Sequence, residues 1–338
     1  MVRRDVLIVG AGHNALTCAA YLARAGLDVL VLERRDQVGG CAVTESVSLG
    51  EDGGGDTFRF SRASYLAGLL RPHIVRELDL MDRYGLRMIG RDPYSYTPSL
   101  PGASGEDQGL ALWSDAEKTK ASISRYSAED ARRFEEYESF LDAAKSAIVP
   151  LLDGAPPDLF DSGATLAERW EASKRVLRAL RPFSPSRDPR HTLLDVSRLF
   201  TCPASTLLDE FFESEVLKTT LCTDAIIGSM VPPSQPGSGY VLLHHVMGEA
   251  LHYGAGSGHG DEAAPSTSWC YVQGGMGSIT RALASAARDH GAEIRVSTPV
   301  ARIKLQAAAK SGETVASGVV LEDGSEIEAD IVCSGCDP

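Results

Sequence analysis

A short glycine-containing motif near the start of the chain constrains the fold more than any other feature. Residues 10–15 read Gly-Ala-Gly-His-Asn-Ala, which fits the pattern G-x-G-x-x-G/A. The motif follows the apolar run Asp5 to Val9 and opens the segment Ala15 to Ala25, which reads as a helix ending at Gly26. A second apolar run, Asp28 to Leu32, comes next. This order predicts a βαβ unit of the Rossmann type, with the motif turning from strand to helix.

The residue types in this motif indicate a bound dinucleotide. Gly10 permits the tight turn, Gly12 lets a pyrophosphate approach the backbone, and the small Ala15 allows the helix to pack closely on the strand. The amide groups and the dipole at the helix N-terminus then face the phosphates. Glu33 ends the second strand, 21 residues beyond Gly12, where its carboxylate accepts hydrogen bonds from both ribose hydroxyls. A carboxylate there disfavours a 2′-phosphate, which argues against NADP.

Length and composition fit a globular protein of two domains. The chain has 338 residues, of which 43% are hydrophobic and 23% are charged, and domains commonly run to about 150 residues. This is too apolar for a disordered chain. With 33 basic and 46 acidic side chains, the formal net charge is −13. Such a field repels phosphate backbones and anionic lipid headgroups, so nucleic acid is a poor candidate partner.

The sequence contains neither a predicted membrane span nor a targeting peptide. No uncharged run approaches the roughly 20 apolar residues that a spanning helix needs, and the first strand begins only a few residues after Met1. These absences predict a cytoplasmic protein without a transmembrane segment. The seven cysteines are odd in number, scattered and mostly embedded in apolar stretches, as expected of reduced intracellular thiols.

The pattern along the whole chain predicts an α/β domain that is interrupted by a helix-rich region. Residues 1–90 hold the βαβ unit and further apolar stretches, including strand-like material at Leu86 to Ile89. Residues 91–268 are mainly helical, and within them 253–268 read as a mobile surface loop because they are rich in Gly, Ser and Ala. The alternation of strands and helices returns in residues 269–338, so the chain re-enters the first domain there.

Local signals place several elements more closely. Ser114 and Glu117 have the spacing of a capping box ahead of a helix. A helix is predicted over Ser278 to His290, and residues 322–324, Glu-Asp-Gly, mark a hairpin turn between two β-type runs.

The stretch after the second strand resembles a known family. Residues 33–40 read Glu-Arg-Arg-Asp-Gln-Val-Gly-Gly, and an acidic residue, an arginine and a Gly-Gly pair in this place resemble the flavin-binding signature of amine oxidases and carotenoid desaturases. A Gly pair lets the backbone approach the diphosphate from its other side, while Arg supplies charge-assisted hydrogen bonds. The stretches 58–65, 91–98 and 236–245 resemble phytoene-desaturase-like flavoproteins, and the resemblance covers essentially the whole chain except the Gly-rich insertions 50–56 and 253–268.

The resemblance implies FAD as the cofactor and hydride transfer between an organic, apolar small-molecule substrate and the flavin. It makes residues 1–90 and 269–338 two segments of a Rossmann-type FAD-binding domain, and residues 91–268 the inserted substrate region. Because the cofactor carries the hard chemistry in such enzymes, no catalytic residue is assigned. The predicted cofactor-binding residues are Gly10, Ala11, Gly12, His13, Asn14, Ala15, Glu33, Arg34, Arg35, Gly39, Gly40, Cys41, Ala42 and Val300; the predicted loop near flavin and substrate is Gly274, Gly275, Met276 and Gly277.

The resemblance also bears on completeness and compartment. Related flavoproteins continue beyond the point where this chain ends, and a third cofactor-binding segment belongs to the part that is absent here. We therefore expect weak FAD binding and little turnover from residues 1–338 alone, with association of chains through uncovered strand edges. The placement of some relatives makes the mitochondrial matrix the alternative to the cytoplasm.

Three further motifs have competing interpretations. The Gly cluster at 274–277 is equally explained as a turn before a helix. Cys333 and Cys336 form a C-x-x-C at the end of a strand, but their place fits packing near the cofactor better than dithiol exchange. His244 and His245 lie in an apolar run without a nearby acidic ligand, so packed histidines are favoured and no metal is assigned.

Two other functions remain open beside a flavin oxidoreductase. One is an NAD-linked dehydrogenase, which does not need the segment Arg34 to Gly40. The other is a non-catalytic protein that FAD stabilises and that works through an interface. The simplest structural alternative, a tight turn followed by a solvated glutamate, is disfavoured because strand, motif and Glu33 are all in register.

Overall fold

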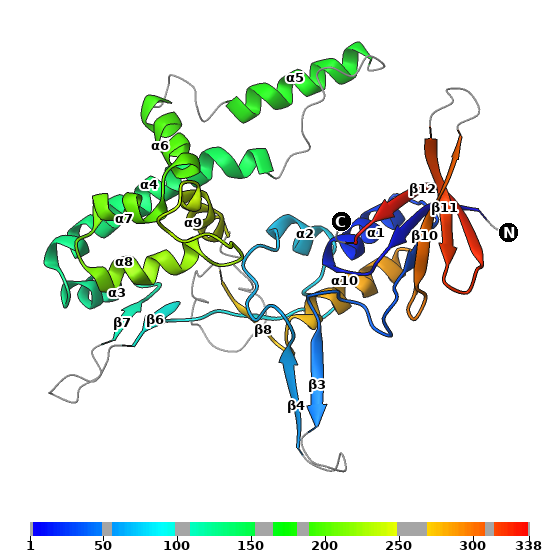
Figure 1. Cartoon of the computed structure of the whole chain (residues 1–338), viewed down its shortest axis with the longest axis horizontal. Helices are drawn as coiled ribbons and strands as arrows, with labels where there is room; N and C mark the ends of the chain where they lie inside the picture. Colours follow the sequence, from blue (N-terminus) through cyan, green and yellow to red (C-terminus); the bar gives the residue numbers. More distant parts are fainter. Residues whose placement is uncertain are drawn as a thin grey trace. The chain divides into compact units, whose positions relative to one another are not determined.

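The computed structural model describes residues 3–48, 56–98, 109–152, 165–180, 189–248, 269–307 and 314–336 (Figure 1). These residues divide into two compact units. The first unit combines the described parts of Met1–Gly90 and Trp269–Pro338, and the second lies within Arg91–Ala250. Each unit is described by itself below.

A six-stranded sheet forms the centre of the first unit, with the strand order β10-β11-β12-β1-β2-β9. β1 pairs in parallel with both β2 and β12, and β2 pairs in parallel with β9, whereas β10, β11 and β12 are joined by antiparallel pairing. The bounds are β1 Arg4–Val9, β2 Val29–Leu32, β9 Glu293–Arg295, β10 Val300–Ala307, β11 Thr314–Leu321 and β12 Glu326–Ser334. The expected βαβ unit and the hairpin turn at 322–324 are thus both present.

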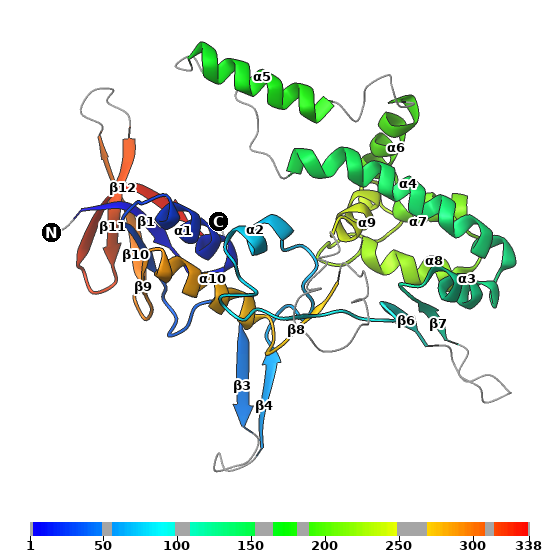
Figure 2. The ribbon, with the colours of Figure 1, turned by 180° about the vertical axis from the view of Figure 1, so that it is seen from behind.

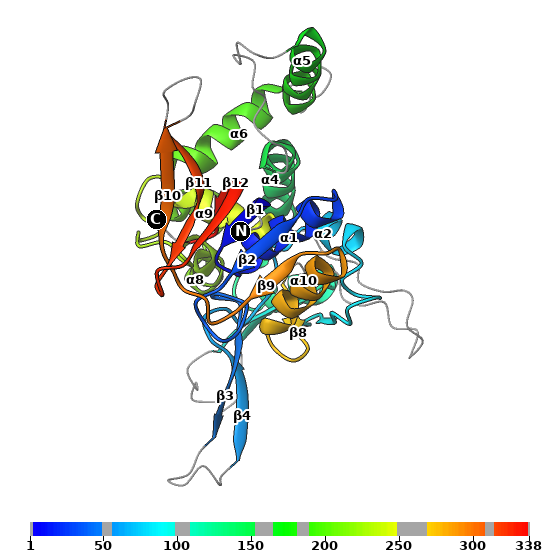
Figure 3. The same ribbon diagram turned by 90° about the vertical axis from the view of Figure 1, so that its right-hand side faces the viewer.

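Two helices cover one face of this sheet. α1 (His13–Arg24) and α10 (Gly277–Asp289) contact one another on the same side of the strands, as Figure 3 shows. Val6 and Ile8 of β1 belong to the core beneath them, whereas Leu7 points to the opposite face and packs with Val319 of β11. Both faces of β1 are therefore buried, which explains why its sequence is a continuous apolar run.

Smaller elements complete the first unit. β3 (Thr44–Ser48) and β4 (Thr57–Ser61) form an antiparallel hairpin that extends away from the sheet (Figure 2). α2 spans Pro72–Glu77, and the short strands β5 (Met88–Ile89) and β8 (Tyr271–Val272) pair with each other. β5 lies near the end of the first sequence segment of this unit and β8 lies near the start of its last segment. Their pairing therefore joins two segments that are far apart in sequence.

The second unit is built mainly from helices around a separate apolar core. Aromatic side chains of α4 pack there against those at the C-terminal end of α7. The ring centroid of Tyr137 lies 5.2 Å from that of Phe212 and 5.5 Å from that of Phe211. A short hairpin, β6–β7, accompanies the helices. The bounds are β6 Ser95–Thr97, β7 Leu110–Leu112, α3 Ala116–Ser124, α4 Ala128–Leu152, α5 Leu166–Leu180, α6 Pro189–Thr201, α7 Ala204–Phe211, α8 Glu215–Cys222 and α9 Ser238–Val246.

The capping box predicted at Ser114 and Glu117 is wrong by one residue. Asp115 is the N-cap of α3, and its carboxylate accepts hydrogen bonds from the amides of Glu117 and Lys118. A carboxylate caps a helix as well as a hydroxyl does, so two adjacent capping residues made the sequence signal ambiguous. The loop predicted at 253–268 lies outside the described residues.

Candidate dinucleotide site

The predicted glycine motif forms an open turn at the end of β1. Gly10 has φ +91°, a left-handed conformation that favours glycine, and α1 begins directly after Gly12. Gly12 carries no side-chain cap for the helix, and the first turn of α1 has no acidic residue. A Cβ atom added at Gly12 would meet nothing within 4 Å. The first-turn amides of α1 therefore adjoin free space, which is the arrangement that binds a diphosphate.

Glu33 is fixed beside this turn. Its side chain is only 6% exposed, and its carboxylate accepts hydrogen bonds from the Ala11 amide at 2.7 Å and the Arg35 amide at 2.9 Å. These bonds hold the carboxylate at the end of β2. The position is the one expected for an acidic residue that recognises a ribose, and the two amides orient it before any ligand binds.

The Gly39–Gly40 pair closes the other side of the turn. The Gly39 amide donates to the Ala11 carbonyl at 2.8 Å, and Gly39 forms an isolated bridge with Gly12. A Cβ atom on Gly40 would lie 3.2 Å from the Cα of Gly12, and one on Gly39 would lie 2.8 Å from the Ala42 carbonyl oxygen. Both positions also have positive φ. Glycine is therefore favoured at both positions for two reasons: the two backbone segments approach closely, and a residue with a side chain would be strained at these positive φ angles.

The neighbouring predicted residues take different positions. Arg34 and Cys41 are exposed, and so are His13 and Asn14 on the first turn of α1, whereas Ala15 and Ala42 are buried. Arg35 is half-buried and forms an ion pair with Glu45 at 2.9 Å. Arg35 is thereby engaged with the hairpin, and Arg34 is the arginine of the pair that stays available to an anion.

Val300 lies near the same edge of the sheet because the segment before it is hydrogen-bonded to the chain around Glu33. The Ser297 amide donates to the Arg35 carbonyl at 2.7 Å, and the Thr298 amide donates to the Glu33 carbonyl at 2.8 Å. Val300 begins β10 two residues later and is half-buried. Residues more than 260 positions apart in sequence are therefore brought together around Glu33.

Gly335 and Cys336 also border the turn; the sequence analysis expected Cys336 to pack near the cofactor but did not assign Gly335. The Gly335 amide donates to the Val9 carbonyl at 2.8 Å, and a Cβ on Gly335 would come within 2.8 Å of the Cβ of Ala15. Cys336 Sγ lies 3.8 Å from the Val9 carbonyl oxygen. The small residue directly after a parallel strand was the available signal for Gly335.

The two cysteines of this C-x-x-C do not interact with each other in the described structure. All seven cysteines are free thiols. Cys333 packs with the core beneath α1 and interacts with the thiol of Cys18, and burial is the main cause that raises the pKa of Cys18. The place of Cys333 against this core agrees with a packing role.

The Gly274–Gly277 loop attaches to the β3–β4 hairpin. Thr44 Oγ1 donates to the Gly274 carbonyl and accepts from the Gly277 amide, both at 3.0 Å, and Ser61 Oγ accepts from the Met276 amide at 3.0 Å. Gly275 has φ +80°. On α10, Thr280 Oγ1 donates to the Ala42 carbonyl at 2.8 Å, which ties the helix that follows the loop to the segment after Gly40. Sequence reasoning missed these hydroxyl anchors because isolated Ser and Thr carry no pattern.

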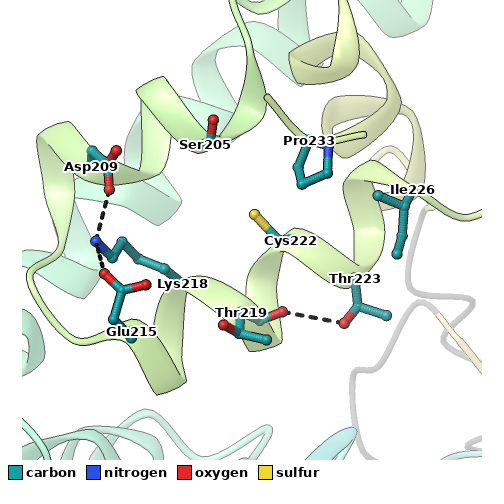
Figure 4. A pocket seen from close by; sticks show the side chains of 9 residues that line it. All are labelled: Ser205, Asp209, Glu215, Lys218, Thr219, Cys222, Thr223, Ile226 and Pro233. Carbon is teal, nitrogen blue, oxygen red and sulfur yellow. Dashed lines mark hydrogen bonds and ion pairs between the residues drawn. The ribbon is translucent and has the colours of Figure 1, made fainter. Parts of the chain in front are cut away.

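The second unit contains a separate cavity of about 460 Å³ (Figure 4). Lys218 lies at one end, where its ammonium group pairs with Asp209 at 2.7 Å and Glu215 at 2.6 Å. The cavity also has hydroxyl, thiol and apolar walls. The single ammonium group of Lys218 is shared by two carboxylates, which leaves these three charged groups with a net charge of −1. Its lining comprises Ser205, Asp209, Glu215, Lys218, Thr219, Cys222, Thr223, Ile226 and Pro233.

His244 and His245 of α9 are packed side chains. His245 is 6% exposed and its Nδ1 lies 2.9 Å from the Val241 carbonyl. Burial and the neighbouring His245 lower the pKa of His244. Within the described ranges, no group of three or more His, Cys, Asp or Glu side chains is arranged to hold a metal ion.

Among the helices that the structure describes, none is both long enough and apolar enough to cross a bilayer. The cytoplasmic placement stays a prediction.

Comparison with known proteins defines the class to which this chain belongs. The chain belongs to the family of flavin containing amine oxidoreductases, whose model matches residues 112–338, and a model of NAD(P)-binding Rossmann-like domains matches residues 8–75. The predicted α/β fold with a Rossmann-type domain and the predicted family resemblance are therefore confirmed.

Individual relatives place the chain more closely within the family. It is 42% identical over 338 residues to pyridine nucleotide-disulfide oxidoreductase domain-containing protein 2 of Rattus norvegicus, covering 99% of this chain and 53% of the relative. It is 24% identical over 339 residues to phytoene desaturase of Fusarium fujikuroi, covering 99% of this chain and 50% of that protein. The chain thus spans about half the length of these relatives.

A solved structure shares the fold at low sequence identity. The RAB GDI of Plasmodium falciparum superposes with a TM-score of 0.54 at 14% identity, covering 98% of this chain and 65% of that one. Because such a likeness shows the fold alone, it does not select an activity.

Proposed function

We propose that this chain binds FAD and forms part of an oxidoreductase that transfers a hydride between an apolar organic substrate and the flavin. The observation that carries the proposal is the turn at Gly12. Free space above Gly12, the uncapped first turn of α1 and the buried Glu33 carboxylate together suit a diphosphate and an unphosphorylated ribose.

The chain's own residues supply binding and orientation. The first-turn amides of α1 would hold the diphosphate, with Gly39 and Gly40 allowing close approach from the other side. Glu33, oriented by the amides of Ala11 and Arg35, would accept the ribose hydroxyls. Bound FAD would supply the hydride-accepting ring, so no side chain of this chain needs to act as a nucleophile.

The apolar character of the substrate is supported by a relative. Phytoene, named in the Fusarium relative, is a hydrocarbon. The family match favours a flavin over NAD. The segment Arg34 to Gly40 supports the same choice, because it provides a second backbone contact that an NAD site does not need.

The absorption spectrum of the purified chain and the identity of its extracted cofactor test the proposal. We expect weak binding of added FAD, seen as flavin absorption and as FAD in the extract of the loaded chain, and no binding of NAD or NADP. Recovery of NAD instead would favour the NAD-linked dehydrogenase. Bound FAD that no substrate can reduce would favour the non-catalytic, FAD-stabilised protein.

A further inference from the structure

Two arginines of the first unit come from β4 and α10, which are both anchored to the Gly274–Gly277 loop. Arg59 is on β4 and Arg281 is on α10, and both are exposed. Neither forms an ion pair within the part of the chain that the structure describes, whereas the nearby Arg35 and Arg62 both pair with Glu45. The pair therefore stands out in a chain whose net charge is −13.

The hairpin register places Arg59 on the face that meets the loop before α10. Arg59 lies opposite Ser46, and Thr44 lies opposite Ser61. Side chains two residues apart on a strand share a face, so Arg59 projects from the same face as Ser61, whose hydroxyl accepts from the Met276 amide. Glu45 lies on the other face and leaves Arg59 uncompensated. Figure 1 shows α10 beside the base of β3 and β4.

Arg281 folds back over the same loop. Its Nη2 donates to Ser278 Oγ at 2.8 Å. A Cβ atom on Gly277 would lie 3.0 Å from Nη1, and one on Gly274 would lie 3.7 Å from Nη2. The guanidinium thus lies against the loop, at the end of α10 where its peptide dipoles are positive and where no acidic residue is present in the first turn.

The two guanidinium groups repel each other. Burial and the positive charge of Arg59 lower the pKa of Arg281 from its ordinary value. Like charges held close together destabilise the folded state, and a bound anion removes that cost. A phosphate group carries a charge of about −1.5 to −2 at pH 7, which matches two guanidiniums, whereas a carboxylate neutralises one.

We propose that Arg59 and Arg281 form a binding site for the phosphate group of a small molecule other than FAD, with the Gly274–Gly277 loop as its floor. The inference does not require the proposed flavin chemistry, although the floor of the site is the loop predicted to lie near flavin and substrate. It is separate from the turn at Gly12, which is where the FAD diphosphate is expected.

Calorimetric titration of the chain with inorganic phosphate at constant ionic strength tests the site, with acetate and chloride as comparison anions. We expect phosphate to bind more tightly than acetate, and Arg59→Gln or Arg281→Gln to weaken phosphate binding roughly tenfold or more. Arg288→Gln is the matched control, since Arg288 is exposed on the same helix two turns further on. Equal loss in this control, or equal binding of acetate, would overturn the proposal.

The same titration separates this site from the cofactor site. Phosphate binding should persist in the FAD-loaded chain and in Gly12→Val, even if no flavin binds at all. Competition between FAD and phosphate would assign the arginines to the cofactor and contradict the inference.

A second measurement does not depend on a detectable affinity. At low salt and without phosphate, Arg281→Gln should raise the thermal midpoint of unfolding because it removes the repulsion, and added phosphate should stabilise the parent chain but not the variant. Arg288→Gln should show neither effect. A lowered midpoint in Arg281→Gln at low salt would mean that the pair is not strained, and the proposal would fail.

Discussion

Gly12 offers a test of ligand binding that leaves the fold intact. Its φ of −73° suits any residue, and a Cβ atom added there would meet nothing within 4 Å. Gly12→Val should therefore keep the thermal midpoint while weakening FAD binding at least about 100-fold, because the side chain would occupy the space of the diphosphate. Flavin fluorescence titration measures the affinity. Thr17→Val, one turn further along α1, is the control and should bind FAD normally.

Glu33 should contribute to stability as well as to binding. Replacing it with Ala leaves the amides of Ala11 and Arg35 without their acceptor, so Glu33→Ala should lower the free energy of unfolding of the first unit by about 2 kcal/mol. Glu33→Gln keeps one carbonyl acceptor and should lose less. Urea denaturation without cofactor measures both, and a neutral Glu33→Ala would show that the carboxylate has no structural role.

At the scale of elements, Asp130 joins α4 to the start of α8. It is fully buried, and its two carboxylate oxygens accept hydrogen bonds from the amides of Glu213 and Ser214, each at 2.9 Å. Asp130→Ala should destabilise the second unit by about 2 to 4 kcal/mol, because two buried donors lose their partner. Asp209→Ala breaks an exposed ion pair with Lys218 and should cost less than about 1 kcal/mol. Equal costs in urea denaturation would contradict this ranking.

The packing around the short helix that follows α8 should make the second unit sensitive to pH. Burial raises the pKa of Asp224, although the positive charges of His245 and Arg91 oppose the shift. A carboxyl group whose pKa is raised by folding holds its proton more tightly in the folded state, so its stabilising contribution is lost as pH rises through that raised pKa. Asp224→Asn should therefore match the parent chain at acidic pH and become more stable than it at neutral pH.

Asp323→Asn is the control with the opposite sign. The Ser325 hydroxyl and amide lower the pKa of Asp323, so its contribution is present at neutral pH and is lost as pH falls through the lowered pKa. Unfolding measured from acidic to neutral pH should show the two variants diverging from the parent in opposite directions. A parallel response would refute the assignment of burial as the cause at Asp224.

For the whole molecule, separate apolar cores predict separate unfolding. The core under α1 and α10 and the aromatic core of the second unit are distinct clusters. Calorimetry should therefore resolve two transitions. Glu33→Ala should lower, and added FAD should raise, the midpoint of the transition of the first unit alone. Asp130→Ala should lower the midpoint of the second unit alone. One shared transition that moves in every case would show that the units unfold cooperatively.

Features encoded within a few neighbouring residues could be predicted from sequence. The turn at 10–15, the strand ending at Glu33 and the helix over α10 depend on local φ preferences and on apolar periodicity, and they lie within a residue or two of their expected positions. Where two local signals compete, as at Ser114 and Asp115, the sequence left the choice open and the structure selected Asp115.

The sequence by itself determined the Rossmann turn, because a glycine, a strand and a helix in one order permit few other conformations. Only the tertiary structure decided what surrounds that turn. Strand order sets Gly335 against Ala15, although 320 positions separate them. The hairpin register sets Arg59 on the strand face that meets the loop before α10. Such contacts follow from which strands pair and in which register. That pairing is a property of the whole packed sheet, and no short stretch of residues encodes it.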